Sequence, residues 1–269
     1  MTISGRVLVV AGSDSSGGAG IEADIKAITM MGAYAATAIT AVTAQDTYGV
    51  HAIHEMPGLF LARQIGLVLD DIGADAIKTG MLVNEANIIA LSRLLAARDL
   101  RIPLVIDPVM LATSGTPLLP AGAVGALIKL LMPLAALITP NLPEAETLSG
   151  IPIGSLEEMV EAARILRGLG APAVLIKGGH LEGMVVHDVL LHNLEIEVFS
   201  SPRIDTPHTH GTGCTLASAV AAGIAQKMTV RDAVDRARRY VQAAITSAPG
   251  FGGGHGPLDH TADWRSISP

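Results

Sequence analysis

The chain has 269 residues, of which 49% are hydrophobic but only 3% aromatic, and it carries a formal net charge of −7 with a pI near 5.7. The acidic balance argues against a nucleic-acid-binding surface. The single cysteine excludes an intrachain disulfide framework and fits a reducing compartment. Because the apolar runs are too short for a membrane span and the first residues lack a signal-peptide pattern, we expect a cytoplasmic protein with no membrane or nucleic-acid partner.

Apolar runs of strand length alternate along the chain with segments of helical periodicity. The predicted strands are residues 7–11, 35–42, 76–78, 104–106, 135–138 and 174–176. The predicted helices are residues 21–31, 59–69, 86–97, 156–166 and 230–245. This alternation predicts an α/β fold in which a mostly parallel sheet is covered by helices on both faces.

A hairpin-like pair, residues 185–191 and 194–199, follows the last of these strands, with His192 and Asn193 between its two halves. We expect this pair to add antiparallel strands at one edge of the sheet. No linker, low-complexity segment or clear repeat interrupts the chain. The sequence therefore predicts a single domain over residues 1–269.

Polar residues stand just past nearly every predicted strand, at the carboxyl ends where open parallel sheets bind their ligands. These residues include Asp14, Gln45, Lys78, Asp107, Asn141 and Lys177. Together with a glycine-rich loop at residues 12–20, they predict a site for a polyanion and for a divalent metal ion.

The glycine-rich loop itself permits two interpretations. It lacks the Gly-Lys-Ser/Thr end of a Walker loop, but residues 18–23 match the G-x-G-x-x-A dinucleotide fingerprint between a strand and a helix. That fingerprint also requires an acidic residue about 20 positions further on, and the corresponding region has none. A nicotinamide-dependent dehydrogenase is therefore the disfavoured alternative of a different class.

A second glycine motif, Gly211-Thr212-Gly213-Cys214, runs into a nearly all-apolar stretch at residues 216–225. An all-apolar helix is a buried one, and its N-terminus attracts negative charge. A thiol in that first turn should have a lowered pKa. The alternatives are a structural cysteine and a zinc site that also uses His208 and His210, for which no second ligand cluster completes the coordination.

Two carboxylates allow both a structural and a functional interpretation. Asp24 lies on the apolar stripe of its predicted helix, so it needs a partner, either the loop's own backbone amides or a polar ligand. Asn141 followed by Glu144 is a helix-start pair, and a metal role near Asp107 is compatible with it.

Taken in order, the motifs resemble those of the hydroxymethylpyrimidine/phosphomethylpyrimidine kinases, the thiamin-biosynthesis branch of the ribokinase-like kinases. The resemblance covers about residues 7–260 and implies a ribokinase-like fold. Its segments are GSDSSGGAGIEAD (12–24), AVTAQ (41–45), KTGML (78–82), DPVM (107–110), ITPNLPE (138–144), KGGH (177–180), THGTGCT (209–215) and GHGPLDH (254–260).

The resemblance implies an ATP- and Mg²⁺-dependent phosphorylation of hydroxymethylpyrimidine and of its monophosphate, by a homodimer. It assigns the pyrimidine pocket to Gln45, Asp24, Gly12, Met81 and Val109. It assigns catalysis to Cys214 and Lys177 with the backbone of Gly211 and Gly213. It assigns the nucleotide to Asn141, Thr212 and Lys177, and Mg²⁺ to Asp107 and Glu144. Ribokinase-like kinases commonly hold an aspartate base at the position of Cys214, whereas the hydroxymethylpyrimidine kinases have cysteine.

Two further alternatives remain at this point. A pyridoxal or pyridoxine kinase of the same superfamily would have a similar pocket. A non-catalytic ligand-binding regulator on the same fold would be expected to lose polar groups at the sheet rim, yet Asp107, Glu144, Lys177 and Cys214 are all present.

Overall fold

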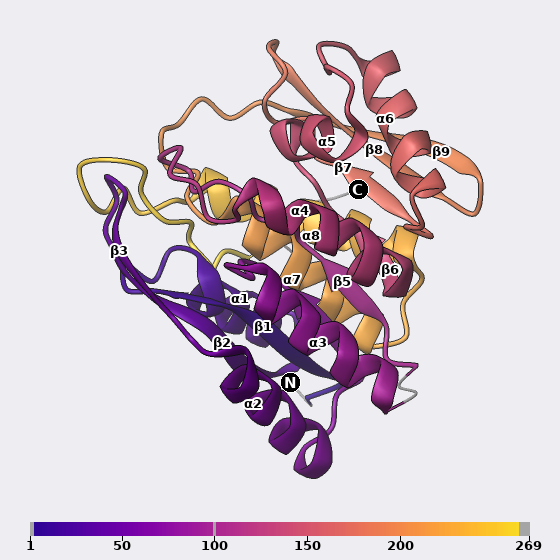
Figure 1. Cartoon of the computed structure of the whole chain (residues 1–269). Helices are drawn as coiled ribbons and strands as arrows, with labels where there is room; N and C mark the ends of the chain where they lie inside the picture. Colours follow the sequence, from indigo (N-terminus) through magenta and orange to yellow (C-terminus); the bar gives the residue numbers. More distant parts are fainter. Residues whose placement is uncertain (1–2, 99–100, 264–269) are drawn as a thin grey trace.

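A computed structural model describes residues 3–98 and 101–263 of the chain. Over these residues nine strands form one sheet in the order β3-β2-β1-β4-β5-β6-β7-β8-β9 (Figure 1). The strands are β1 (Arg6–Asp14), β2 (Tyr34–Gln45), β3 (Val50–Glu55), β4 (Ala76–Thr79), β5 (Leu104–Ile106), β6 (Ala135–Ile138), β7 (Val174–Ile176), β8 (Val185–His192) and β9 (Glu195–Pro202). Pairing from β2 to β7 is parallel, and β3, β8 and β9 add antiparallel strands at the two edges.

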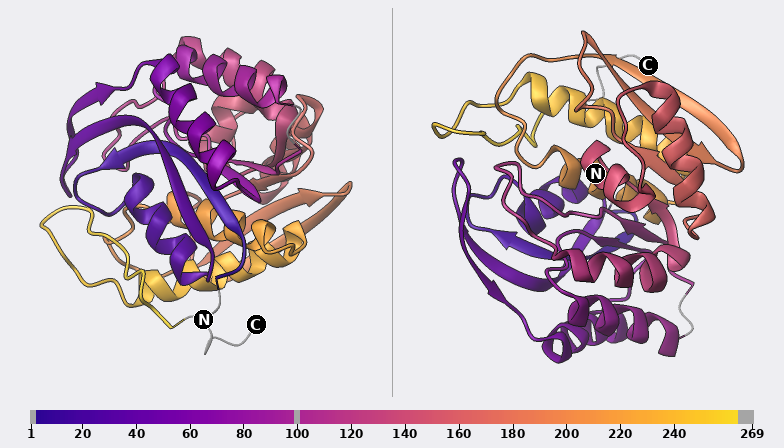
Figure 2. Two further views of the ribbon diagram at one scale, coloured as in Figure 1. Left: turned by 90° about the horizontal axis from the view of Figure 1, so that it is seen from below. Right: turned by 45° about the horizontal axis from the view of Figure 1, so that its top comes forward.

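Helices cover both faces of this sheet. They are α1 (Gly20–Met30), α2 (Gly58–Asp71), α3 (Glu85–Ala97), α4 (Ala121–Ala126) with its continuation η1 (Leu127–Leu131) and η2 (Met132–Leu134), α5 (Leu142–Ser149), α6 (Leu156–Gly168), α7 (Thr212–Ala225) and α8 (Val230–Thr246). One core packs α2 to α6 against one face, and a second core packs α1, α7 and α8 against the other (Figure 2). None of the helices in the described part of the chain is long and apolar enough to cross a bilayer.

The central strands are apolar on both sides because they lie between these two cores. Along β1, Leu8 and Val10 contribute to the core beneath α2 to α6, whereas Val7, Val9 and Ala11 contribute to the core beneath α1, α7 and α8. Successive side chains of a strand point to opposite faces, so a strand that is covered on both faces must be continuously apolar.

The mostly parallel α/β architecture predicted from the sequence is confirmed, and so are the six central strands, the five helices and the antiparallel hairpin. Strand β3 was not predicted, because five of its six residues are exposed and it carries His51 and His54. A solvated edge strand of that kind lacks the apolar pattern on which the prediction relied.

Helix α7 positions the site. Every residue from Thr215 to Ala225 is buried, because α7 packs between α1 and α8 and reaches the central strands. Its N-terminus lies near the carboxyl ends of β5 and β7, whose following residues are Asp107 and Lys177. Apolar burial of one helix therefore places a helix N-terminus at the rim of the sheet.

Candidate functional site

A cavity of about 1180 Å³ opens at the carboxyl rim of the sheet. Nearly all of the site residues predicted from the sequence line it, although they are far apart in the chain. They are Gly12, Gln45, Met81, Asp107, Val109, Asn141, Glu144, Lys177, Gly211, Thr212, Gly213 and Cys214. Asp24 is absent from this lining.

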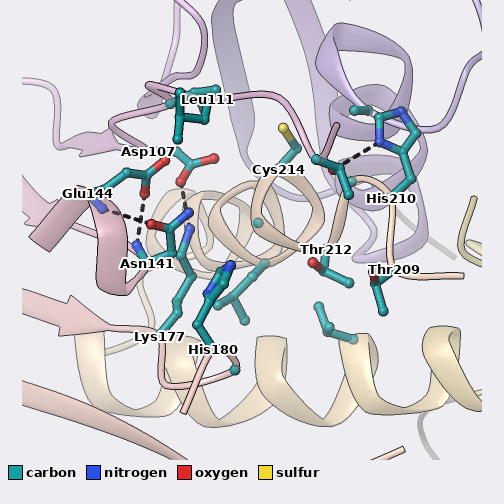
Figure 3. Close-up of a pocket in the computed structure, with 18 of the residues that line it drawn as sticks. Asp107, Leu111, Asn141, Glu144, Lys177, His180, Thr209, His210, Thr212 and Cys214 are labelled. Carbon is teal, nitrogen blue, oxygen red and sulfur yellow. Dashed lines mark hydrogen bonds and ion pairs between the residues drawn. The ribbon is translucent and has the colours of Figure 1, made fainter. Parts of the chain in front are cut away.

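At one end of the cavity a lysine and an aspartate pair directly. Lys177 Nζ donates to Asp107 Oδ1 at 2.9 Å (Figure 3). Thr139 Oγ1 lies 3.3 Å from the same oxygen. Burial lowers the pKa of Lys177, but the negative charges of Asp107 and Glu144 outweigh it and the pKa is raised. Lys177 is therefore a fixed cation at this end of the cavity.

Glu144 stands beside this pair as part of the start of α5. Its Oε2 accepts from the backbone N–H of Asn141 at 2.8 Å, and Asn141 Oδ1 accepts from the backbone N–H of Glu144 at 2.9 Å. This reciprocal capping confirms the helix-start interpretation. Burial and the nearby charge of Asp107 raise the pKa of Glu144 to about 7, although Lys177 opposes them.

The two carboxylates of Asp107 and Glu144 fit a hard divalent cation. Mg²⁺ is bound by one or two protein carboxylates together with water and substrate phosphates, so two are sufficient. Repulsion from Asp107 is one cause of the raised pKa of Glu144, and a cation between them would relieve it. Among the described residues no group of three or more His, Cys, Asp and Glu side chains is placed to hold a metal ion by itself.

The N-terminus of α7 faces the same end of the cavity. Gly211 has φ +82°, and a Cβ there would stand 1.9 Å from the carbonyl oxygen of Gly18, so only glycine fits. A Cβ on Gly213 would lie 3.1 Å from Lys177 Nζ and 3.8 Å from Asp107 Oδ2. An anion in this space would meet the amide groups of the first turn and the Lys177 ammonium together.

Cys214 lies in that first turn and lines the cavity. The sequence predicted a lowered pKa for its thiol, and the structure shows the opposite. Burial raises the pKa of Cys214 to about 12, although the Lys78 ammonium and the backbone N–H of Gly20 favour the thiolate. Desolvation of the charged form is the dominant effect here, so the thiol is protonated at neutral pH.

Asp24 lies in the interior rather than in the cavity, contrary to the substrate contact that the sequence analysis expected. Its Oδ1 accepts from Lys78 Nζ at 2.8 Å and from Ser218 Oγ at 2.7 Å, and Asp24 and Lys78 are both fully buried. The partner of Asp24 is thus a lysine on β4 and a serine on α7, not the loop amides. Lys78, which the sequence placed at the rim, is inside the protein as well.

At the other end of the cavity, Gln45, Met81, Val109 and Gly12 lie together with a pair that sequence reasoning missed. His210 Nε2 lies 2.8 Å from Asp14 Oδ2, and both side chains are buried. The sequence had raised His210 only as a zinc ligand. Its position inside the glycine motif was the one signal of a role in the site. Figure 3 shows His210 on the opposite side of Cys214 from Asp107, Glu144 and Lys177.

Comparison with known proteins places this chain in a family. Residues 14–259 match the family described as phosphomethylpyrimidine kinase. The chain is 50% identical over 95% of its length to a thiamine biosynthesis bifunctional protein from Geobacter sulfurreducens, and it spans 52% of that protein. It is 43% identical to a hydroxymethylpyrimidine/phosphomethylpyrimidine kinase from Bacillus subtilis, covering 97% of this chain and 96% of that one.

Among solved structures, a pyridoxal kinase from Staphylococcus aureus in complex with AMP-PCP and pyridoxal is similar. Its TM-score is 0.89 at 35% sequence identity, with 97% of this chain and 95% of that chain covered. A phosphomethylpyrimidine kinase structure from Clostridium difficile is also similar, with a TM-score of 0.79 at 39% identity, 89% of this chain and 99% of that chain covered. The backbone is therefore similar to kinases of both names.

Proposed function

The chain belongs to the phosphomethylpyrimidine kinase family, and from this premise we propose that it transfers the γ-phosphate of ATP to 4-amino-5-hydroxymethyl-2-methylpyrimidine. The same site then phosphorylates the monophosphate to the diphosphate, as a step of thiamin biosynthesis. The observation that carries the proposal is the cavity itself. It has an amide-bearing end at Gln45 and a cationic end at Lys177, which the N-terminus of α7 also faces.

Phosphoryl transfer requires positioning and neutralisation of negative charge rather than covalent chemistry by the protein. In our proposal Lys177 and the backbone amides of Gly211 to Cys214 hold the transferring phosphate. Asn141 and Thr212 contact the rest of the nucleotide. The geometric support is the close approach of Gly213 to Lys177, where a Cβ on the glycine would lie 3.1 Å from Lys177 Nζ.

Mg²⁺ would be held by Asp107 and Glu144, where it would neutralise phosphate charge during transfer. The adjacent carboxylates keep Lys177 charged. The backbone N–H of Asn141, at the start of α5, orients the Glu144 carboxylate.

The pyrimidine would lie at the end that contains Gln45, Met81, Val109 and Gly12. An amide side chain can donate to a ring nitrogen and accept from a neighbouring exocyclic amine. Met81 and Val109 are apolar and can pack against the ring. The hydroxymethyl group of the substrate would then point toward Cys214, in the middle of the cavity.

Pyridoxal kinase is the second candidate, favoured by the backbone similarity to the Staphylococcus aureus enzyme. The deciding experiment measures ATP turnover with hydroxymethylpyrimidine and with pyridoxal side by side. We expect higher kcat/KM for the pyrimidine, and we expect Gln45→Ala to raise its KM far more than the KM for ATP. A preference for pyridoxal would overturn the proposed substrate, and equal effects of Gln45→Ala on both KM values would make Gln45 merely structural.

A further inference from the structure

His210 contacts several segments that are distant in the sequence. Its Nε2 lies 2.8 Å from Asp14 Oδ2 and 3.3 Å from Gln45 Nε2, and its Nδ1 lies 3.3 Å from Thr113 Oγ1. A Cβ on Gly18 would lie only 2.4 Å from the imidazole ring, so the glycine-rich loop packs directly on it. The ring has little freedom to rotate.

Asp14 determines which nitrogen of His210 carries a proton. Burial raises the pKa of Asp14, but hydrogen bonds from His210, Ser16 and Ala19 outweigh it and lower the pKa to about 2. The carboxylate is therefore ionised and can only accept. Its contact with His210 Nε2 consequently requires an N–H on that nitrogen.

This N–H in turn restricts the amide of Gln45. With Gln45 Nε2 facing His210 Nε2, two N–H donors would oppose each other at 3.3 Å without an acceptor. The two orientations of an amide differ by a 180° rotation, and the hydrogen-bond partners decide between them. The rotated amide instead places Oε1 3.3 Å from Nε2, where it can share the N–H that His210 donates to Asp14 as the weaker acceptor of a three-centre hydrogen bond.

Thr43 supports the same orientation. Its Oγ1 lies 3.0 Å from the backbone oxygen of Ser13 and 3.2 Å from Gln45 Oε1, so in the unrotated amide its single proton faces two acceptors. A hydroxyl has one proton, so it can donate to Ser13 and accept from Gln45 at the same time. With the amide rotated, Gln45 Nε2 donates to Thr43 Oγ1, and the Thr43 hydroxyl donates to the backbone oxygen of Ser13.

We propose that His210 is a positioning residue that holds the Gln45 amide in one orientation and thereby selects substrates with a ring nitrogen beside an exocyclic amine. The inference rests on the proposed function and names the feature of the substrate that is read. In this orientation the remaining lone pair of Oε1 and the remaining N–H of Nε2 face the substrate in a fixed order, with the acceptor on the His210 side and the donor on the Thr43 side. A 4-aminopyrimidine and its 4-oxo analogue, which presents a carbonyl beside a ring N–H, require opposite orders in the same pose, so a fixed amide can match only one of them in that pose.

The test compares two substitutions that differ only in reach. His210→Gln extends about as far as Nε2 of the imidazole and can still donate to Asp14 and Gln45, whereas His210→Asn stops short. We expect His210→Asn to lower the preference for the 4-amino over the 4-oxo pyrimidine by roughly tenfold, the effect of one misdirected hydrogen bond. His210→Gln should recover most of the preference, and KM for ATP should not change in either variant.

His208→Asn is the matched control, because His208 lies two residues away and does not line the cavity. A double-mutant cycle with Gln45→Ala tests the route of the effect. If His210 acts through Gln45, His210→Asn should change KM for the aminopyrimidine no further in the Gln45→Ala background. Additive effects, an unchanged preference in His210→Asn, or equal losses in His210→Asn and His210→Gln would each overturn the inference.

Calorimetric binding of the two pyrimidines without ATP separates this inference from the proposed function. A wild-type protein that binds the 4-amino compound selectively but does not phosphorylate it would refute the kinase assignment and keep the role of His210. A wild-type protein that phosphorylates it, together with an Asn variant that binds both pyrimidines as the wild type does, would refute the role of His210 alone.

Discussion

Cys214 is a residue whose chemistry is controlled by its surroundings rather than by its type. Its place at a helix N-terminus favours the thiolate, yet burial is stronger and raises its pKa to about 12. If the thiolate removes the proton of the substrate hydroxyl, only a small fraction of the protein is competent at neutral pH. As long as the pH is below the pKa, the thiolate fraction increases about tenfold for each unit by which the pH rises.

We therefore predict that wild-type kcat rises between pH 7 and pH 9, measured by ADP release at saturating substrates. Cys214→Ala should fold, bind ATP and lose most turnover, while Cys214→Asp should retain a measurable part with a flatter pH profile, because an aspartate is already ionised. Turnover of the Ala variant at the wild-type level would show that the thiol only packs and that the backbone of the loop supplies the catalysis.

Glu144 makes a pH-dependent contribution to stability. Its pKa is raised from 4.5 to about 7, so between these values the folded protein holds a proton that the unfolded chain has lost. Stability falls with rising pH wherever the folded state binds more protons. Glu144 should therefore lower the free energy of unfolding by roughly 1–3 kcal/mol as the pH rises through this window.

Glu144→Gln removes the titrating group but keeps an oxygen that can accept from Asn141. We predict that its urea-unfolding free energy relative to wild type increases between pH 5 and pH 8. Glu157→Gln, an exposed position on α6, is the control and should show no such trend. Parallel curves for wild type and Glu144→Gln would contradict the raised pKa.

At the scale of elements, the buried pair of Asp24 and Lys78 joins α1 to β4, and Ser218 adds α7 to the same contact. Removing one partner of a buried ion pair leaves an uncompensated charge and typically costs about 3–5 kcal/mol. Ion pairs on the surface contribute little by comparison. The pair therefore connects the strand, the first helix and the helix that carries the phosphate-binding turn.

Asp24→Ala should accordingly lower the free energy of unfolding by about 3–5 kcal/mol in urea denaturation. The double variant Asp24→Asn with Lys78→Met should recover much of this loss, because it leaves no unpaired charge. Asp70→Ala, which breaks the exposed pair with Arg98, is the control and should cost less than about 1 kcal/mol. If Asp24→Ala had near-normal stability but a raised KM for the pyrimidine, the result would instead support the substrate contact of Asp24 that the sequence predicted.

At the scale of the whole molecule, we propose a single domain that forms a homodimer in the cytoplasm. One continuous sheet links the described residues, and three large apolar side chains of α2 are exposed, with Leu59 at 90%, Phe60 at 53% and Leu67 at 62%. A cluster of exposed apolar side chains is typical of an interaction surface.

We predict a dimeric mass by sedimentation equilibrium, and a shift toward the monomer in Leu59→Glu. Leu194→Glu, at the exposed tip between β8 and β9, is the control and should leave the mass unchanged. A monomeric wild type at micromolar concentration would contradict the dimer, and a dimer unaffected by Leu59→Glu would place its interface elsewhere.

Most of the architecture could be predicted from the sequence, because it depends on local patterns. Continuous apolar runs marked the central strands, apolar periodicity marked the helices, and the capping pair of Asn141 and Glu144 marked the start of α5. Gln45, Asp107, Asn141 and Lys177 were predicted from their places after the strands, because carboxyl ends of parallel strands meet at one edge. Met81 and Val109 came from the family resemblance, and Lys78, predicted by the same rule, is buried inside the protein. Edge strand β3 was not predicted, because its exposed residues carry no apolar pattern.

What the sequence by itself determined is thus the order of elements, the family resemblance and the residues that meet at the rim. Only the tertiary structure decided the partners and charges of those residues. Lys78 contacts Asp24 across 54 positions, and His210 contacts Asp14 across 196. The pKa values of Cys214 and Glu144 depend on burial by distant segments. Burial and pairing are properties of the packed chain, and no local pattern contains them.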